Sequence, residues 1–128
     1  MTAALAEVQA SHLEGNIPPA ADFEAFLRRD LTAYFETAGV SDPQVEVELL
    51  RQGATQSGIA YPKYYAWVQV HSGGKLAQEG AVRVAAIDRV RFEITDFMPS
   101  ATIKADPAGV GAVFPPALVP AIQDRAAN

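Results

Sequence analysis

KYYAWVQVHSGGKLAQEGAVRVAAIDRVRFEITDF, residues 63–97, is the stretch that decides the fold. Apolar side chains fall on alternate positions within it, a period of two that is typical of strands with one buried face. Two reversals interrupt the pattern, one at Gly73-Gly74 and one near Asp88, where residues that favour turns occur. The stretch therefore predicts three consecutive antiparallel strands whose even-numbered positions form the apolar face.

The first reversal decides how the strands pair. We favour a three-residue loop over residues 72–74, which places His71 opposite Lys75 and keeps the even positions on one face. A two-residue loop of Gly73-Gly74 would instead reverse the parity, and a bulge at Gly80 would then be needed to restore it. The apolar face is the same in both cases.

The strongest periodic signal in the chain precedes these strands. Apolar side chains at a spacing of three and four residues predict an amphipathic helix over residues 20–39, which Pro18-Pro19 introduces and Gly39 ends. Valine and leucine then alternate with glutamine and glutamate over residues 44–49, which predicts a half-buried strand. We expect the helix to pack across one face of a four-stranded antiparallel meander within residues 44–97.

Both ends of the chain give weaker signals. Residues 1–18 are either flexible or form a short helix. Residues 98–128 contain five prolines, which prevent any long regular element and leave room for short helices near residues 108–114 and 117–127. We expect this proline-rich tail to close one end of the core, so that residues 1–128 form a single α+β domain.

The composition narrows the classes of partner. The formal charge of -5 argues against nucleic acid or an anionic membrane, because both require a basic surface. The chain has no cysteine, which excludes disulfides and thiolate chemistry. No lysine or arginine precedes the first apolar residues, so the start is a poor secretory signal and a cytoplasmic location is expected. Frequent alanine, and seven arginines against three lysines, suggest a GC-rich bacterial genome.

The odd-numbered face of the sheet carries the side chains most suited to binding. Tyr65 and Trp67 are large and aromatic, and alanines at nearby odd positions leave space beside them. Something usually covers such a patch, and we expect a second subunit first, the C-terminal segment second and a small molecule last. In the preferred register Arg83 stands opposite Glu93 as a cross-strand ion pair. The candidate ligand- or partner-binding residues are Tyr61, Tyr65, Trp67, His71, Arg83, Arg91 and Glu93.

Signatures of catalysis are weak. A general base needs an orienting partner, and His71 would depend on Glu93 or Glu48, neither of which is fixed by its spacing. The two histidines have no metal-ligand spacing, and the Gly-Val-Gly sequence at 109–111 lacks the preceding strand and third glycine of a dinucleotide site. Asp96 falls on the apolar side of its strand, unless the strand ends before it. We therefore predict no catalytic residue, no metal site and no cofactor.

A helix followed by a curled antiparallel sheet that packs on it is similar to the cystatin-like and NTF2-like α+β folds, over residues 20–97. For isomerase and dehydratase members of the NTF2-like group, the resemblance implies an Asp–His pair or comparable acids in a cone between helix and sheet. In this chain the corresponding positions are almost wholly apolar, with Asp96 as the exception. Acidic, cysteine-free α+β chains of this length are also similar to dimeric secretion chaperones.

Two functions are therefore expected. The first is a non-enzymatic bacterial protein-interaction or self-association module, either a homodimer or bound to another protein, that uses the Tyr65/Trp67 face. The alternative is an NTF2-like pocket of the small-ligand-binding or isomerase type, roofed by loop 52–62.

Overall fold

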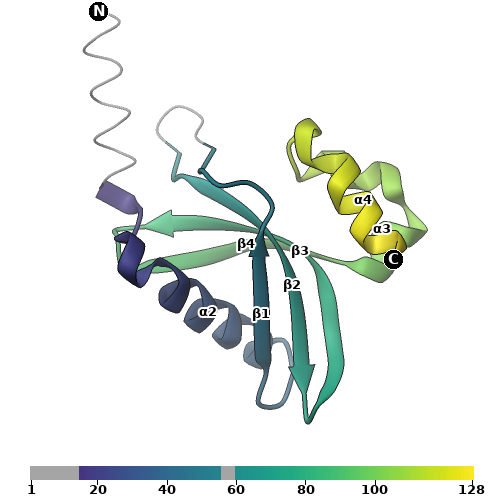
Figure 1. The fold of residues 1–128 in the computed structure, drawn as a ribbon, viewed down its shortest axis with the longest axis horizontal. Coiled ribbons are helices and arrows are strands. Elements are labelled where there is room, and N and C mark those ends of the chain that lie inside the picture. Colours follow the sequence, from purple (N-terminus) through teal and green to yellow (C-terminus); the bar gives the residue numbers. More distant parts are fainter. Residues whose placement is uncertain (1–14, 56–59) are drawn as a thin grey trace, which may run out of the picture.

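The computed structural model describes residues 15–55 and 60–128. In chain order its elements are helix α2 (Ala20–Thr37), strands β1 (Gln44–Leu49), β2 (Lys63–Ser72), β3 (Lys75–Ile87) and β4 (Arg91–Pro99), helix α3 (Ser100–Ala105), the 3-10 turns η1 (Pro107–Ala112) and η2 (Pro116–Leu118), and helix α4 (Val119–Ala127). The strands form one antiparallel sheet in the order β1-β2-β3-β4 (Figure 1). The α+β class and the meander are confirmed, and the expectation for residues 1–14 lies outside the described residues.

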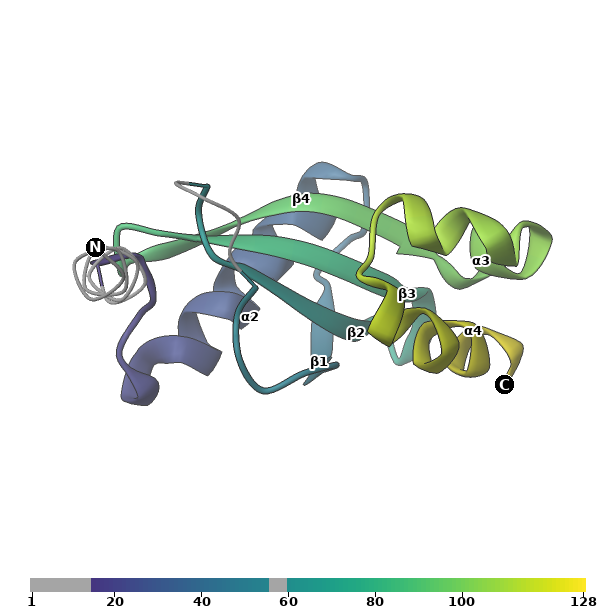
Figure 2. The same cartoon turned by 90° about the horizontal axis from the view of Figure 1, so that it is seen from above.

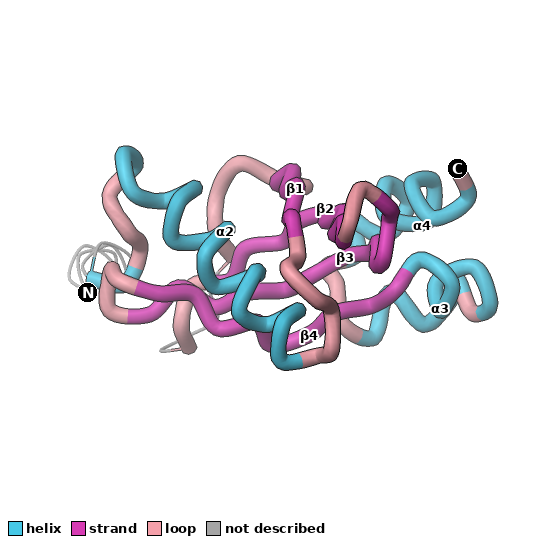
Figure 3. Tube along the Cα trace, turned by 90° about the horizontal axis from the view of Figure 1, so that it is seen from below, coloured by secondary structure: helices cyan, strands magenta, loops and turns pink. Residues whose placement is uncertain are grey.

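The elements stack in three layers. Helix α2 covers one face of the sheet, and the C-terminal helices gather on the other face towards one end (Figures 1 and 2). Figure 3 shows that α2 crosses the strands obliquely. None of the helices in the described residues is long and apolar enough to cross a membrane.

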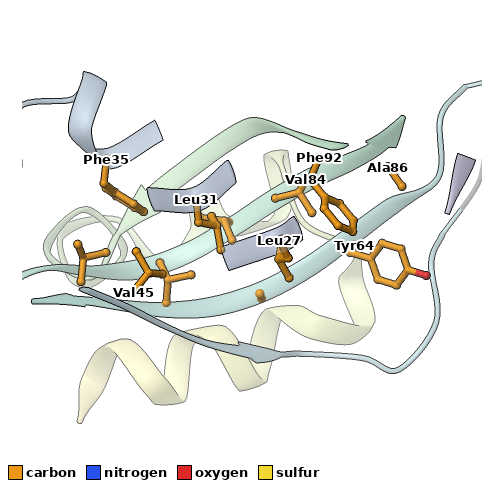
Figure 4. Packing of buried hydrophobic residues seen from close by; sticks show 12 residues of the cluster. Leu27, Leu31, Phe35, Val45, Tyr64, Val84, Ala86 and Phe92 are labelled. Atoms are coloured by element: carbon orange, nitrogen blue, oxygen red, sulfur yellow. The ribbon is translucent and has the colours of Figure 1, made fainter. Parts of the chain in front are cut away.

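The space between α2 and the sheet is filled by apolar side chains. Leu27, Leu31 and Phe35 point from the helix into this core, as the helical spacing predicts (Figure 4). Their partners are the even-numbered strand residues and Val45, and burial there raises the pKa of the Tyr64 hydroxyl. Phe23 adds edge-to-face contacts, with ring centroids 4.8 Å from Tyr64. Burial in this layer therefore explains both the apolar face of α2 and the apolar even-numbered positions of the strands.

The hairpin between β2 and β3 differs from the register that we favoured from the sequence. Its loop is the two-residue Gly73-Gly74, with φ of 60° and 80°, values that glycine adopts readily. Val70 pairs with Gln78 while His71 pairs with Leu76, so Ala77 is the extra residue of a bulge. The alternative loop was the correct one, but the bulge lies beside the turn and not at position 80. It restores the parity immediately, so the apolar face is unchanged.

A second bulge changes the partners of Arg83. Arg83 pairs with Asp96 and Val84 pairs with Ile94, so Thr95 is the extra residue in β4. The bulge moves Asp96 from the apolar face to the opposite face, where its Oδ2 lies 2.5 Å from Nη2 of Arg83. The predicted Arg83–Glu93 pair is therefore wrong: the turn register places Glu93 opposite Ala85, and the bulge, which the sequence pattern does not reveal, then places Asp96 opposite Arg83. Strand β4 also continues past Asp96 to Pro99.

The C-terminal tail is more helical than its prolines suggest. Each of the five prolines lies at or just before the start of a helix or turn, where a missing N–H costs nothing: Pro99 precedes α3, Pro107 opens η1, Pro115 precedes η2, Pro116 opens η2 and Pro120 lies in the first turn of α4. The expected short helices are confirmed, and α3 is an addition. Together they form a compact cover on the odd-numbered face of the sheet.

Side chains of α2 cap the outer edge of β4 where this strand begins. The Phe92 N–H points away from β3 and donates to Oδ2 of Asp30 at 2.7 Å. Nη2 of Arg29 donates to the carbonyl of Val90, also at 2.7 Å. Arg29 and Asp30 bond to each other as well, and this bond raises the pKa of the Arg29 guanidinium. Helix α2 therefore supplies the polar partners that an edge strand would otherwise take from water.

Candidate functional site

The aromatic pair predicted to bind a partner is buried. Tyr65 and Trp67 are each 5% exposed, and they pack with Phe114 and other apolar residues of the C-terminal helices. The Tyr65 hydroxyl is within 2.7 Å of Oγ1 of Thr55, and Nε1 of Trp67 donates to Glu79 at 3.4 Å. The chain's own C-terminal segment is therefore the cover, which was the second of the three expected covers and replaces the first.

Arg83 lies on the same face, but its side chain bonds to other groups of the protein. Besides Asp96, its Nε donates to Oγ1 of Thr95 at 3.0 Å and its Nη1 donates to the carbonyl of Val113 at 3.4 Å. Oδ2 of Asp96 is itself buried, and the facing guanidinium offsets the cost of burying it. Arg83 thus joins the β4 bulge to the C-terminal cover, and its donors are directed towards the protein.

The structure does not bring the remaining candidates together. Tyr61 is exposed ahead of β2, and Arg91 and Glu93 are exposed near the start of β4. His71 lies half-buried at the far end of β2, opposite Gln44. The seven predicted residues therefore form no common site: Tyr65, Trp67 and Arg83 share the covered face, and the other four are dispersed.

A different feature stands out at the opposite edge of the sheet from β4. Among the described residues, β1 pairs with β2 and with no other strand. The N–H of Leu50 donates to the carbonyl of Tyr65 at 2.8 Å, which fixes the phase of the antiparallel ladder. Even-numbered residues of β1 therefore bond to β2, and the N–H and C=O groups of Val45, Val47 and Leu49 point outwards. These three residues form an open backbone edge.

Hollows border this edge on both faces of the sheet. On the α2 side, a hollow of about 360 Å³ lies beside Val47 and Leu49, and one of about 560 Å³ lies beside Val45. On the α4 side, a hollow of about 230 Å³ lies beside Glu46 and Glu48. We call the edge Gln44–Leu49 with these hollows the β1 groove. Its walls are formed by α2 and α4: Phe23, Glu24, Leu27, Arg28, Thr32 and Arg125.

The two walls of the β1 groove differ in charge. On the α2 side, Glu24 and Arg28 form an ion pair at 2.9 Å within one helix. On the α4 side, Arg125 binds Glu48 at 2.7 Å and thereby lowers the pKa of that carboxyl below its ordinary value. Glu46 is exposed beside it. Within the described part of the chain, the groove thus offers unpaired backbone donors and acceptors between an acidic wall on the α4 side and an α2 wall that is mainly apolar beside Val47 and Leu49.

The predicted order of the strands already contains one signal for this site. In a meander the first and last strands lie at the edges, so β1 and β4 are edge strands as soon as the order is predicted. Which of these two edges has free backbone groups depends on where side chains of α2 lie in the folded protein, and the local sequence pattern does not predict this. No cluster of three acidic or histidine side chains suited to a metal ion occurs in residues 15–55 and 60–128.

Comparisons of this chain with protein-family models, with curated proteins and with solved structures find no match.

Proposed function

We propose that this chain is a non-enzymatic protein-interaction domain that binds an extended segment of a partner along β1. The observation that carries the proposal is the open backbone edge of Val45, Val47 and Leu49, bordered by hollows on both faces. An added strand would bond to these groups, while its side chains would enter the hollows alternately on the two faces. Strand addition of this kind is a recurring mode of peptide recognition.

The interior between α2 and the sheet supports a binding role over an enzymatic one. An isomerase of the NTF2-like group would carry its acids there, and here the space is occupied by Leu27, Leu31, Phe35 and valines of the sheet. The second bulge removes Asp96 from that interior. The likeness to the cystatin-like and NTF2-like folds, and a cytoplasmic location, remain predictions within this proposal.

The test uses a neutral octapeptide that alternates threonine with valine. In an antiparallel added strand, the residues that bond to Val45, Val47 and Leu49 also place their side chains on the α2 face. Valines of the peptide should take those positions, because the wall beside Val47 and Leu49 is mainly apolar. N-methylation of every valine should therefore remove about three hydrogen bonds, each contributing roughly 1 kcal/mol, and weaken binding at least tenfold. N-methylation of every threonine should leave binding intact.

Binding is measured by NMR titration of the full chain. We expect chemical-shift changes to concentrate at the amides of Val45, Val47 and Leu49. If both methylated peptides bind equally, or if the shifts concentrate away from β1, strand addition is wrong. Loss of binding on threonine methylation alone would indicate a parallel added strand, in which the bonding phase is reversed.

A further inference from the structure

The two faces of the β1 groove select different side chains on an added strand. We infer that the partner segment is basic, with lysine or arginine alternating with apolar residues, and that it is not a second copy of this chain. This inference rests on the proposed function, because it names the partner class of the same groove.

The part of the α2 wall beside Val47 and Leu49 selects apolar side chains. Val45, Val47 and Leu49 project towards α2, and the hollow beside Val47 and Leu49 is otherwise lined by Ala20, Phe23 and Leu27, with Glu24 as its one charged residue. Leu49 is 36% exposed, so part of its apolar surface is still available to a partner. Every second residue of an added strand faces this wall, and an apolar side chain there would remove that surface from water.

The α4 wall selects positive charge. Glu46 pairs across the strands with Gln69, and Gln69 pairs with Glu79, so these three side chains form a row on this face. Nε2 of Gln69 donates to Glu79 at 2.6 Å, which holds the row together without adding a cation. Within the described part of the chain, Arg125 is the one basic side chain that forms an ion pair in this region, and it pairs with Glu48. Of the carboxylates of Glu46, Glu48 and Glu79, those of Glu46 and Glu79 therefore lack a cationic partner within the described residues, and a lysine or arginine opposite Glu46 would supply one.

The same glutamates disfavour a second copy. If two β1 strands paired antiparallel with Val47 at the centre, Glu46 of each would stand opposite Glu48 of the other. A shift of one residue pair in either direction would place Glu46 opposite Glu46 or Glu48 opposite Glu48. Like charges directly opposite each other destabilise a strand pair, and each chain also carries a net charge of -5. The homodimer expected from the sequence is thus less favoured than a basic partner at this edge.

The inference is tested with three octapeptides in which valine alternates with lysine, threonine or glutamate. We expect the lysine peptide to bind the full chain at least tenfold more tightly than the threonine peptide, which in turn binds more tightly than the glutamate peptide. The Glu46→Lys variant should reverse this order. The matched control is Glu93→Lys, which makes the same charge change on the exposed face of β4 and should preserve the order. Added salt should reduce the preference, because the groove is open to solvent.

Three outcomes would overturn the inference, and they are distinguishable from a failure of the proposed function. Equal binding of the three peptides, with the N-methyl phase effect retained, would show that strand addition is correct and the charge selection is wrong. A lysine preference that Glu93→Lys removes as strongly as Glu46→Lys would show attraction to net charge alone. Shifts at the β1 amides that grow with protein concentration, without any peptide, would identify a second copy as the occupant. If no peptide perturbs β1 at all, both proposals are wrong.

Discussion

The two edges of the sheet differ in whether side chains bond to their outward-pointing backbone groups. At β4, Asp30 and Arg29 of α2 reach across the edge and bond to the backbone of Phe92 and Val90. The bulge at Thr95 then interrupts the regular row of backbone groups further along. At β1, in the described part of the chain, no side chain occupies the corresponding positions, and the strand runs regularly over six residues.

This difference indicates where the chain tolerates another strand. An exposed regular edge is a template for pairing with other chains, and proteins usually protect it with side chains, bulges, charges or a covering segment. Strand β4 has two of these protections, whereas among residues 15–55 and 60–128 β1 has charges alone, in Glu46 and Glu48. Charge prevents pairing with a like-charged strand and favours pairing with an oppositely charged one. The protection of β1 is therefore selective.

The largest expected effect comes from forcing β4 away from β3. Gly80 pairs with Pro99, and a Cβ at this position would lie 2.2 Å from the carbonyl oxygen of Met98. Gly80→Ala should therefore lower the free energy of unfolding by about 3 kcal/mol, because the neighbouring backbone must move to admit the methyl group. Urea denaturation measures this loss. Gly53→Ala is the control, since no atom of the described residues lies within 4 Å of its added Cβ. Equal stability of the two variants would show that β3 and β4 are not held this closely.

A smaller effect is expected from opening the protected edge. Asp30→Ala removes the acceptor of the Phe92 N–H and should cost about 1–2 kcal/mol in unfolding free energy, because a charge-assisted hydrogen bond is lost. Hydrogen exchange reports the edge directly: the Phe92 amide should exchange slowly in the wild type and as fast in the variant as the amides of Val47 and Leu49. Glu36→Ala, on the exposed surface of the same helix, should change neither quantity. An unchanged Phe92 amide in Asp30→Ala would contradict the clamp.

Local patterns predicted the elements of the fold because each rests on residues close in sequence. The period of three and four in α2 and the period of two in β1 both reflect burial on one side. The bulges at Ala77 and Thr95 could not be predicted in this way, since an extra residue leaves the composition of a strand unchanged. The partner of Arg83 was assigned wrongly for two reasons. The turn pairs Ile87 with Arg91, which places Glu93 opposite Ala85, and the inserted Thr95 then brings Asp96 opposite Arg83.

The burial of the aromatic pair was partly readable from the sequence. Residues 64–68 are apolar at every position, and residues 81–87 are apolar apart from Arg83. Continuous apolar runs of this kind are typical of strands that are covered on both faces. The runs therefore indicated a second layer, and the proline-rich tail was the segment available to form it. The open edge, in contrast, depends on where Arg29 and Asp30 reach, which a pattern of alternating residues does not encode.

The smallest expected effect concerns the ion pair at the α4 wall of the β1 groove. The hydrogen bond and the charge of Arg125 lower the pKa of Glu48 below its ordinary value of 4.5. A carboxyl with a lowered pKa in the folded state stabilises it above the ordinary pKa and loses that contribution as the pH falls through the lowered one. Wild type should therefore exceed Glu48→Gln in stability by a small, constant amount from neutral pH to about the ordinary pKa. The difference should then disappear in more acidic solution.

Both partners are substantially exposed, at 63% for Glu48 and 36% for Arg125, so salt should reduce the same difference. Arg125→Gln should reproduce the profile of Glu48→Gln, and the double variant should add little, because the two residues form one interaction. Glu24→Gln is the matched control: its ion pair with Arg28 lies within α2 and cannot hold α4 against β1. The protection of the α4 amides, corrected for the pH dependence of the intrinsic exchange rate, should consequently fall with acid in wild type and change little in Glu48→Gln. A difference that persisted unchanged below the lowered pKa would have another source, and α4 would then be held at the open edge by the apolar contacts of Ile122 and Ala126 alone.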